Sequence, residues 1–149
     1  MPEMPDFPRD PAQLTAFFTK HGRDCLPGLL GIDVIELDKA RSKLALEVKH
    51  QHLASNGYLH AATIVALADT ACGYGCVASL PEGASGFTTL ELKSNHFGTA
   101  LSGVITAEAN LAHGGRTTQV WDAVVASVDS GKAIALFRCT QLILYPTRE

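Results

Sequence analysis

The stretch from His60 to Leu80 reads HAATIVALADTACGYGCVASL and decides the fold of this chain. Alanine and glycine are abundant in it, and Asp69 is the only Asp, Glu, Lys or Arg between Lys49 and Glu82. A helix that is apolar almost all round is a buried helix, and its small side chains allow other backbone to come close. We therefore predict one long central helix that is wrapped by a sheet.

Six strand-like runs surround this helix in the sequence, two before it and four after it. They are Leu30–Leu37, Lys43–Val48, Phe87–Phe97, Gly103–Leu111, Thr117–Val128 and Lys132–Leu144. Hairpin signals at Gly114-Gly115 and at Asp129-Ser130-Gly131 separate the last three runs. Together with a short helix near the N-terminus, the order is α-β-β-α-β-β-β-β, which is typical of an α+β domain with an antiparallel sheet.

The N-terminal residues 1–11 contain four prolines and are predicted to form an extended arm. The amphipathic pattern of Ala12–Lys20 predicts a short helix, and Cys25–Gly28 is interpreted as a turn. No internal repeat or linker is evident. We therefore divide the chain into an N-terminal arm with a short helix, residues 1–24, and a single domain, residues 25–149.

The composition indicates a globular chain, because 46% of the 149 residues are hydrophobic and 18% are charged. The net charge of −3 argues weakly against nucleic acid and anionic membranes as partners. Residues 1–11 lack the basic start and apolar run of a signal peptide, and no continuous apolar run reaches the ~18 residues of a membrane span. The four cysteines form no CxxC motif, so reduced thiols and a cytoplasmic location are expected.

The approach to the central helix and the strand after it carry a family resemblance. The loop Asn56-Gly57-Tyr58-Leu59-His60 leads into a helix that carries Leu67-Ala68-Asp69. This arrangement resembles the hot-dog superfamily, in which a curved antiparallel β-sheet wraps one long α-helix, and within it the PaaI-like acyl-CoA thioesterases. Their Thr-x-Glu-Leu strand has a counterpart in Thr89-Leu90-Glu91-Leu92. The resemblance implies a hydrolase that converts an acyl-CoA, with an aryl or medium-length acyl group, to a free acid and CoA.

Two positions depart from the pattern Asn-x-x-Gly-x-x-His-Gly-Gly that is typical of these enzymes. The Asn falls on Ala54, and the Gly-Gly pair is Ala61-Ala62, while Asn56 lies two residues from the lost position. These departures keep open a non-catalytic hot-dog module that binds acyl-CoA. A hot-dog dehydratase is a second alternative, which is disfavoured because no His is placed to pair with an acid on the central helix.

Asp69 is the candidate catalytic carboxylate. No Lys or Arg lies one helical turn away in either direction, and burying a carboxylate without a partner is unfavourable. Desolvation is therefore expected to raise its pKa and to make it a better base and a less solvated nucleophile. The alternative is a structural Asp that is hydrogen-bonded to the hydroxyl of Thr63 or Thr70.

Two further groups complete the expected catalytic set. Backbone N–H groups in the first turn of a helix are unpaired and carry partial positive charge, so the Ala61 amide is a candidate donor to a thioester carbonyl and its oxyanion. The resemblance places Thr89 where the family often has a Ser or Thr that holds the attacking water. The competing interpretations are a plain helix start at Ala61 and an ordinary strand threonine at Thr89.

Four residues are candidates for substrate binding. Asn56 and Gly57 are turn residues first and substrate contacts second, and His60 is expected mainly to cap or brace their loop. Arg116 follows two glycines in a hairpin and is placed to meet a phosphate of coenzyme A. An exposed hairpin Arg is more often only solvated.

Neither a metal nor a separate cofactor is expected, since coenzyme A is part of the substrate. His50 and His52 lie on one face of a predicted strand, but no further ligand follows at a fixed spacing. Cys72 and Cys76 lack a His that would activate a thiol, so they are interpreted as small core residues.

The apolar helix and the long strands present more surface than one short chain can cover. We therefore expect a homo-oligomer, either a dimer or a homotetramer built as a dimer of dimers. Asp69 lies eight residues beyond Ala61, which is roughly 12 Å along a helix, so one thioester carbonyl cannot meet both groups of the same chain. A two-fold axis would bring Asp69 of one chain near Ala61 of its partner.

Overall fold

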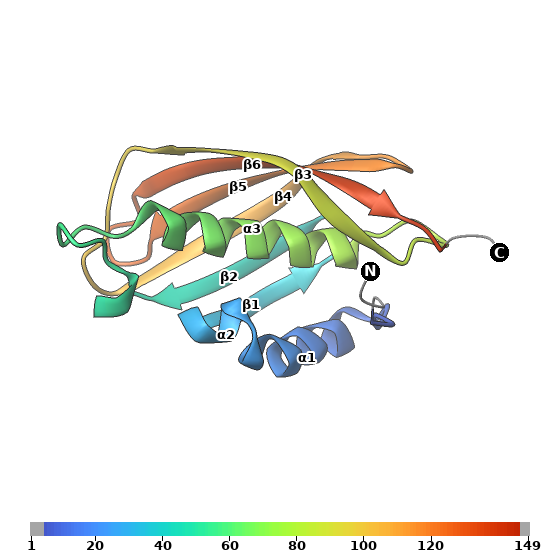
Figure 1. Ribbon diagram of the computed structural model, residues 1–149, viewed down its shortest axis with the longest axis horizontal. Coiled ribbons are helices and arrows are strands. Elements are labelled where there is room, and N and C mark those ends of the chain that lie inside the picture. Colours follow the sequence, from blue (N-terminus) through green and yellow to red (C-terminus); the bar gives the residue numbers. More distant parts are fainter. Residues whose placement is uncertain (1–4, 147–149) are drawn as a thin grey trace.

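The computed structural model describes residues 5–146, which form a curved, six-stranded antiparallel sheet wrapped around one long helix (Figure 1). In chain order the elements are α1 (Pro11–His21), the 3₁₀ turn η1 (Gly22–Asp24), α2 (Leu26–Leu30), β1 (Ile32–Asp38), β2 (Arg41–Glu47), the 3₁₀ turn η2 (His50–His52), α3 (Ala61–Ala78), β3 (Gly86–His96), β4 (Val104–Gly114), β5 (Thr118–Ser127) and β6 (Ala133–Leu144). This architecture confirms the predicted α+β hot-dog fold.

The strand order is β1-β2-β4-β5-β6-β3, so β3 is an edge strand although it directly follows the central helix in sequence. Each described pairing is antiparallel. Alternate residues along the strands point at α3 or at solvent, because side chains in a strand have a period of two. In β2, for example, Leu44 and Leu46 are buried and the flanking Lys43 and Ala45 are not fully buried.

Small residues allow α3 to lie directly on the sheet. Ala68, Ala71 and Cys72 are completely buried, and a Cβ on Gly75 would lie only 2.7 Å from ring atoms of Trp121. Other parts of the chain do come close to this helix, but at Gly75 the close neighbour is the Trp121 side chain, where backbone was predicted.

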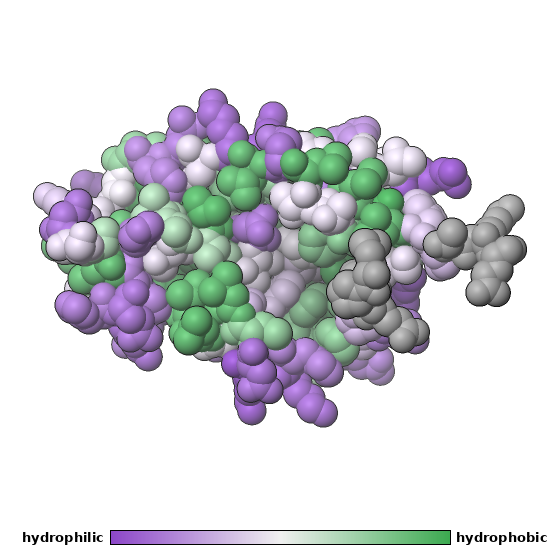
Figure 2. All heavy atoms as spheres, in the orientation of Figure 1, coloured by the Kyte–Doolittle hydropathy of each residue, from purple (hydrophilic) through white to green (hydrophobic). Residues whose placement is uncertain are grey.

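By length and composition alone, α3 could cross a membrane, but 56% of this helix is buried inside the domain. The core helix of a globular protein has the same character, and here the sheet covers one face of it. Hydrophobic side chains remain exposed on the side shown in Figure 2, over β3 and over α2. They include Leu90 and Leu92 of β3 and Leu26 and Leu29 of α2.

Two local predictions were wrong. Cys25–Gly28 is not a simple turn, because residues from Leu26 onward form the short helix α2, with Pro27 in its first turn, where proline is well tolerated. The segment with His50 and His52 is not a strand. The Nδ1 atom of His52 accepts a hydrogen bond from the Lys49 backbone, and this side-chain bond stabilises the turn η2, in which His52 is buried and His50 is exposed.

Residues 5–30 form the N-terminal layer, which lies beside β1 and the C-terminal half of α3 (Figure 1). The ring of Phe18 in α1 stacks on that of Tyr74 in α3 at 3.8 Å between centroids and 11° between planes. Phe7 contacts Phe17 and Phe18 from the arm that precedes α1. The division between residues 24 and 25 stays a prediction.

Candidate active site

Asp69 lies on the side of α3 that faces away from the centre of the sheet, and its carboxylate is more buried than exposed. Among the described residues, no hydrogen-bond donor reaches its buried Oδ1 atom. Burial raises the pKa of Asp69 above the usual 3.8, because a low-dielectric environment penalises the charged form. The expected upward direction of this pKa is confirmed.

The two hydroxyls that could have made Asp69 a structural residue are bonded elsewhere. Thr70 donates to the Ala66 carbonyl at 2.6 Å, and Thr63 donates to the His52 carbonyl at 3.0 Å. Asp69 is therefore available to a ligand in a way that a satisfied core carboxylate is not.

Thr89 belongs to β3, which runs back along α3 toward its N-terminus (Figure 1). A Cβ on Gly73 would lie 3.0 Å from the ring of Phe87, so these two residues are neighbours. Thr89 is two strand residues beyond Phe87, roughly 7 Å, and Asp69 is one helical turn before Gly73, roughly 6 Å. Thr89 is exposed, and its contact with Asp69 stays a prediction.

The loop before α3 is held in a tight turn by its own backbone. Gly57 adopts a φ of +86°, which favours glycine, and the Tyr58 N–H donates to the Asn56 side chain at 3.2 Å. Ala54 accepts from Gly57 at 2.8 Å and donates to Tyr58 at 2.7 Å. Asn56 is thus a turn residue, as expected, while its NH₂ group stays on the exposed surface.

His60 is the N-cap of α3, and its Nδ1 atom accepts a hydrogen bond from the Ala62 N–H at 2.9 Å. The expected capping role of His60 is confirmed. The N–H of Ala61 has no acceptor among residues 5–146, so it is one of the orphan donors that a helix N-terminus presents to a ligand.

Arg116 lies in the hairpin between β4 and β5, with its guanidinium 5.6 Å from the centre of the Tyr145 ring. Tyr145 also donates to the Arg116 carbonyl at 2.6 Å. This hairpin is at the end of the sheet where α3 finishes, opposite to the loop that carries Asn56 (Figure 1). Within one chain, the structure therefore separates Arg116 from that loop, and Ala61 from Asp69.

An apolar cavity of about 290 Å³ opens beside Asp69. Aromatic side chains from distant parts of the sequence line it: Phe7, Phe18, Tyr74 and Phe87. These residues were missed from the sequence, because the arm matches no family pattern and an aromatic residue in a short helix is usually a core residue. The clustering of Phe7, Phe17 and Phe18 within a few turns of chain was the available signal.

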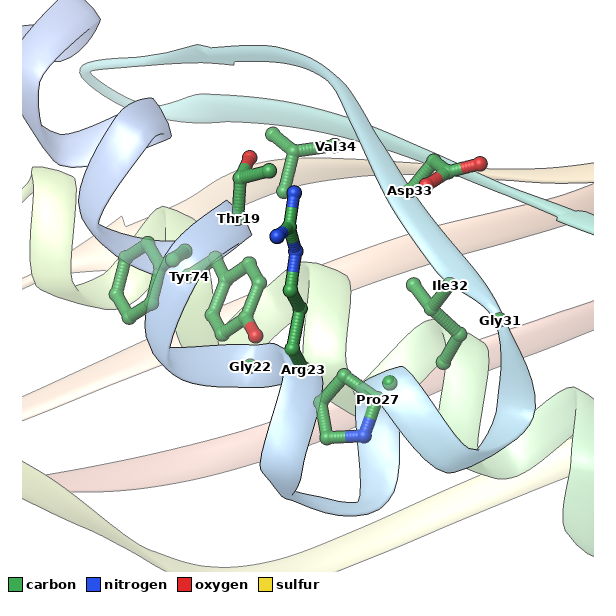
Figure 3. Close-up of a pocket in the computed structure, with 11 residues that line it drawn as sticks. Thr19, Gly22, Arg23, Pro27, Gly31, Ile32, Asp33, Val34 and Tyr74 are labelled. Carbon is green, nitrogen blue, oxygen red and sulfur yellow. The ribbon is translucent and has the colours of Figure 1, made fainter.

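A second cavity, of about 190 Å³, lies between the N-terminal layer and β1. Figure 3 shows Arg23 pointing into it between Thr19 and Val34 while Asp33 points away. Asp69 does not line this cavity. The stacked Phe18 and Tyr74 rings border both cavities and stand between them.

Cys72, Cys76 and Cys139 are completely buried. A hydrogen bond with Cys139, together with burial, raises the pKa of Cys72, and burial raises the pKa of Cys76 to about 12. Cys72 and Cys76 are therefore core residues, as expected, and not thiolates. Within residues 5–146, no group of three or more His, Cys, Asp or Glu side chains is arranged to hold a metal.

The sequence model of the thioesterase superfamily matches residues 56–134, which include α3 and most of the sheet. The chain belongs to the thioesterase superfamily. As a member of it, the protein is a thioester hydrolase. It is 32% identical over 111 residues to the 1,4-dihydroxy-2-naphthoyl-CoA hydrolase of Listeria monocytogenes, across 74% of this chain and 89% of the relative.

Solved structures of this superfamily have the same fold. The PaaI protein of the phenylacetic acid degradation operon of E. coli superimposes with a TM-score of 0.79 at 26% identity, over 91% of this chain and 95% of that one. A mutant thioesterase from Pseudomonas aeruginosa also gives a TM-score of 0.79, at 28% identity over 95% and 98% of the two chains. The recognised likeness to PaaI-like thioesterases is thereby confirmed.

Proposed function

We propose that this thioesterase hydrolyses an acyl-CoA with an aryl or medium-length acyl group to the free acid and CoA. The observation that carries the proposal is the buried, unpartnered Oδ1 of Asp69 at the mouth of an apolar cavity. A carboxylate in such surroundings is a stronger base and a less solvated nucleophile than one in water. The cavity offers room for an acyl group next to that carboxylate.

In this proposal Asp69 acts on the thioester carbonyl either as a general base or as a nucleophile. As a base, it takes a proton from a water held by Thr89, and the water oxygen bonds to the carbonyl carbon. As a nucleophile, its own oxygen forms that bond, and water then hydrolyses the resulting anhydride. In both routes the C–S bond breaks, CoA leaves as a thiolate, and the Ala61 N–H stabilises the oxyanion.

We further propose that the site is completed by a second copy of the chain. The edge strand β3 exposes Leu90 and Leu92, and a long apolar edge favours pairing with another strand. Asp69 and Ala61 are roughly 12 Å apart along α3, too far for one carbonyl. A two-fold axis that sets two copies of α3 antiparallel would place Asp69 of one chain near Ala61 of its partner.

The same axis would bring together the proposed contacts for coenzyme A. It would move the loop with Asn56, Gly57 and His60 of the partner to the end of the sheet where Arg116 lies. The guanidinium of Arg116 is exposed and suits a phosphate. We also propose that the protein works in the cytoplasm, without a metal or separate cofactor, so a chelator is expected to leave its activity unchanged.

The function is tested with a panel of acyl-CoA substrates and detection of the released thiol. Steady turnover of at least one aryl- or medium-chain acyl-CoA is expected. Tight binding of acyl-CoA without turnover would favour the alternative of a non-catalytic binding module. That alternative rests on Ala54, which offers only backbone groups where the family has an Asn side chain.

The shared site is tested with a purified heterodimer of one Asp69→Asn chain and one Ala61→Pro chain. Proline at this position removes only a donor that lacks an acceptor, and His60, with ψ of 132°, already has the extended backbone that precedes proline. Sites shared between chains leave one intact site per heterodimer, so about half of the wild-type activity is expected. Activity as low as in both mutant homodimers would refute the shared site.

A further inference from the structure

The cavity beside Asp69 is walled by aromatic rings from four separate parts of the chain. Phe7 comes from the N-terminal arm, Phe18 from α1, Tyr74 from α3 and Phe87 from β3. The N-terminal layer is therefore part of the wall next to the carboxylate.

Two residues of the arm, Phe7 and Arg9, fix it over the cavity. Arg9 donates to the Ala84 carbonyl at 3.3 Å, which ties the arm to the loop before β3. The Phe7 ring packs edge-on against Phe17 at 5.6 Å and lies 5.9 Å from Phe18. These contacts hold the Phe7 ring at a defined place.

The interior of the cavity has few groups that could solvate a polar ligand. Asp69 and Thr70 are polar residues of α3 that line the cavity. The Thr70 hydroxyl already donates a hydrogen bond to the Ala66 carbonyl. The Tyr74 hydroxyl lies on the other side of its ring, near Gly22 and the second cavity (Figure 3). The space suits an apolar group attached to a carbonyl that meets Asp69.

A further apolar cavity, of about 340 Å³, begins where the first one ends. It is lined by Phe17 and His21 and shares Phe7, Phe18, Pro27 and Tyr74 with the cavity at Asp69. Phe18 and Tyr74 are packed against each other and Pro27 belongs to α2, whereas Phe7 stands on an extended arm. The Phe7 ring is therefore the wall whose removal would join the two spaces.

Given the thioesterase function proposed above, we propose that the cavity at Asp69 is the acyl pocket and that Phe7 makes it selective for an aromatic acyl group. A planar ring fits among aromatic walls in edge-to-face or offset contacts. The volume of about 290 Å³ lies just below the range of about 300–1,000 Å³ for small-molecule sites. It suits a ring-sized group, and Phe7 blocks a long straight chain from the space beyond.

The test compares kcat/KM for benzoyl-CoA and decanoyl-CoA in the wild type, Phe7→Ala and Leu29→Ala. Leu29 is an exposed residue of α2 that lines neither cavity, so its variant is the matched control. Phe7→Ala is expected to lower the benzoyl-to-decanoyl ratio by roughly tenfold or more, while Leu29→Ala keeps the wild-type ratio. An unchanged ratio in Phe7→Ala would overturn the proposal.

A second variant covers a Phe7→Ala protein that does not fold. Thr70→Leu narrows the same cavity from α3 and is expected to reduce kcat/KM roughly tenfold more for benzoyl-CoA than for acetyl-CoA. Equal losses for both substrates would count against the pocket. If a partner chain fills the cavity instead, Phe7→Ala weakens dimerisation and leaves the substrate ratio unchanged, which also overturns the proposal.

Binding experiments separate this proposal from the function on which it rests. If wild-type protein releases no CoA from any substrate, the hydrolase proposal fails. The pocket is then tested by comparing calorimetric Kd values for benzoyl-CoA and decanoyl-CoA in place of kcat/KM. A preference for benzoyl-CoA that Phe7→Ala removes would still support the pocket. The absence of that preference would refute it.

Discussion

α3 has small residues both on the face that packs on the sheet and on the face that looks away from it, but they serve different purposes. On the sheet side, Gly75 leaves room for the Trp121 ring, and the Trp121 N–H is hydrogen-bonded to Gln119 at 2.8 Å. On the open side, Gly73 leaves room for Phe87, and one oxygen of Asp69 has no donor among the described residues. Close packing against the sheet characterises the first face, and a cavity with a carboxylate oxygen that no described donor reaches characterises the second.

Because of this difference, we expect one face of α3 to contribute mainly to stability and the other mainly to activity. A buried carboxylate oxygen without a partner lowers stability, and Asp69 lies beside a cavity, so we expect the open face to serve a ligand. Substitutions on the sheet side are expected to act mainly on the free energy of unfolding. Substitutions on the open side are expected to act mainly on turnover.

The largest effect is expected from Asp69→Asn, which removes the ionisable group of the open face and keeps its shape. We expect kcat to fall by ~10²–10⁴, the usual contribution of a general base. The melting temperature should not fall, because no hydrogen bond among the described residues is lost at Oδ1. Thiol-release assays measure kcat, and calorimetry measures the melting temperature. Wild-type turnover in a folded variant would remove Asp69 from the mechanism.

Gly75→Ala and Gly73→Ala compare the two faces directly. A methyl group at Gly75 would lie 2.7 Å from Trp121 atoms, so overpacking should reduce the free energy of unfolding by about 1–3 kcal/mol. The helix preference for Ala offsets up to about 1 kcal/mol of this loss. At Gly73, a methyl group would lie 3.0 Å from the Phe87 ring. This ring borders a cavity and can move, so Gly73→Ala should lower the free energy of unfolding less than Gly75→Ala. Equal losses for the two variants in urea titrations would contradict the comparison.

The raised pKa of Asp69 gives stability a distinct pH dependence. The folded protein holds this proton more tightly than the unfolded chain, so the stability contributed by Asp69 is fully present below its usual pKa of 3.8 and is lost as the pH rises through the raised pKa. The unfolding free energy of Asp69→Asn minus that of the wild type should therefore increase with pH across this window and then level off. Urea unfolding of both proteins at several pH values measures it. A difference that is independent of pH would refute a raised pKa.

The smallest effect is expected at the N-terminus of α3, where the side chain of His60 accepts from the Ala62 N–H. Loss of the N-cap in His60→Ala should lower the free energy of unfolding by about 0.5–2 kcal/mol. His60→Asn, which can also accept from the Ala62 N–H, should restore most of this loss. If Asn fails to restore stability, the imidazole acts through contacts other than the cap.

The long helix, the strands and the environment of Asp69 were predictable because each depends on local pattern. An apolar run with one carboxylate is buried wherever it packs, and alternation identifies a strand without knowledge of its neighbour. The turn at His50–His52 was not predictable, since it depends on the hydrogen bond between Lys49 and the His52 ring. The helix at Leu26–Leu30 is too short to show a helical period.

The sequence by itself determined that this chain wraps a sheet around an apolar helix and that Asp69 is desolvated within it. Only the tertiary structure decided which residues surround that carboxylate. Phe87 lies against Gly73, one helical turn beyond Asp69, because β3 leaves the end of α3 and runs back along it to pair with β6. Phe7 and Phe18 line the same cavity because the N-terminal layer folds onto α3. Such contacts depend on strand order and on packing between distant segments, and spacing along the chain carries no information about either.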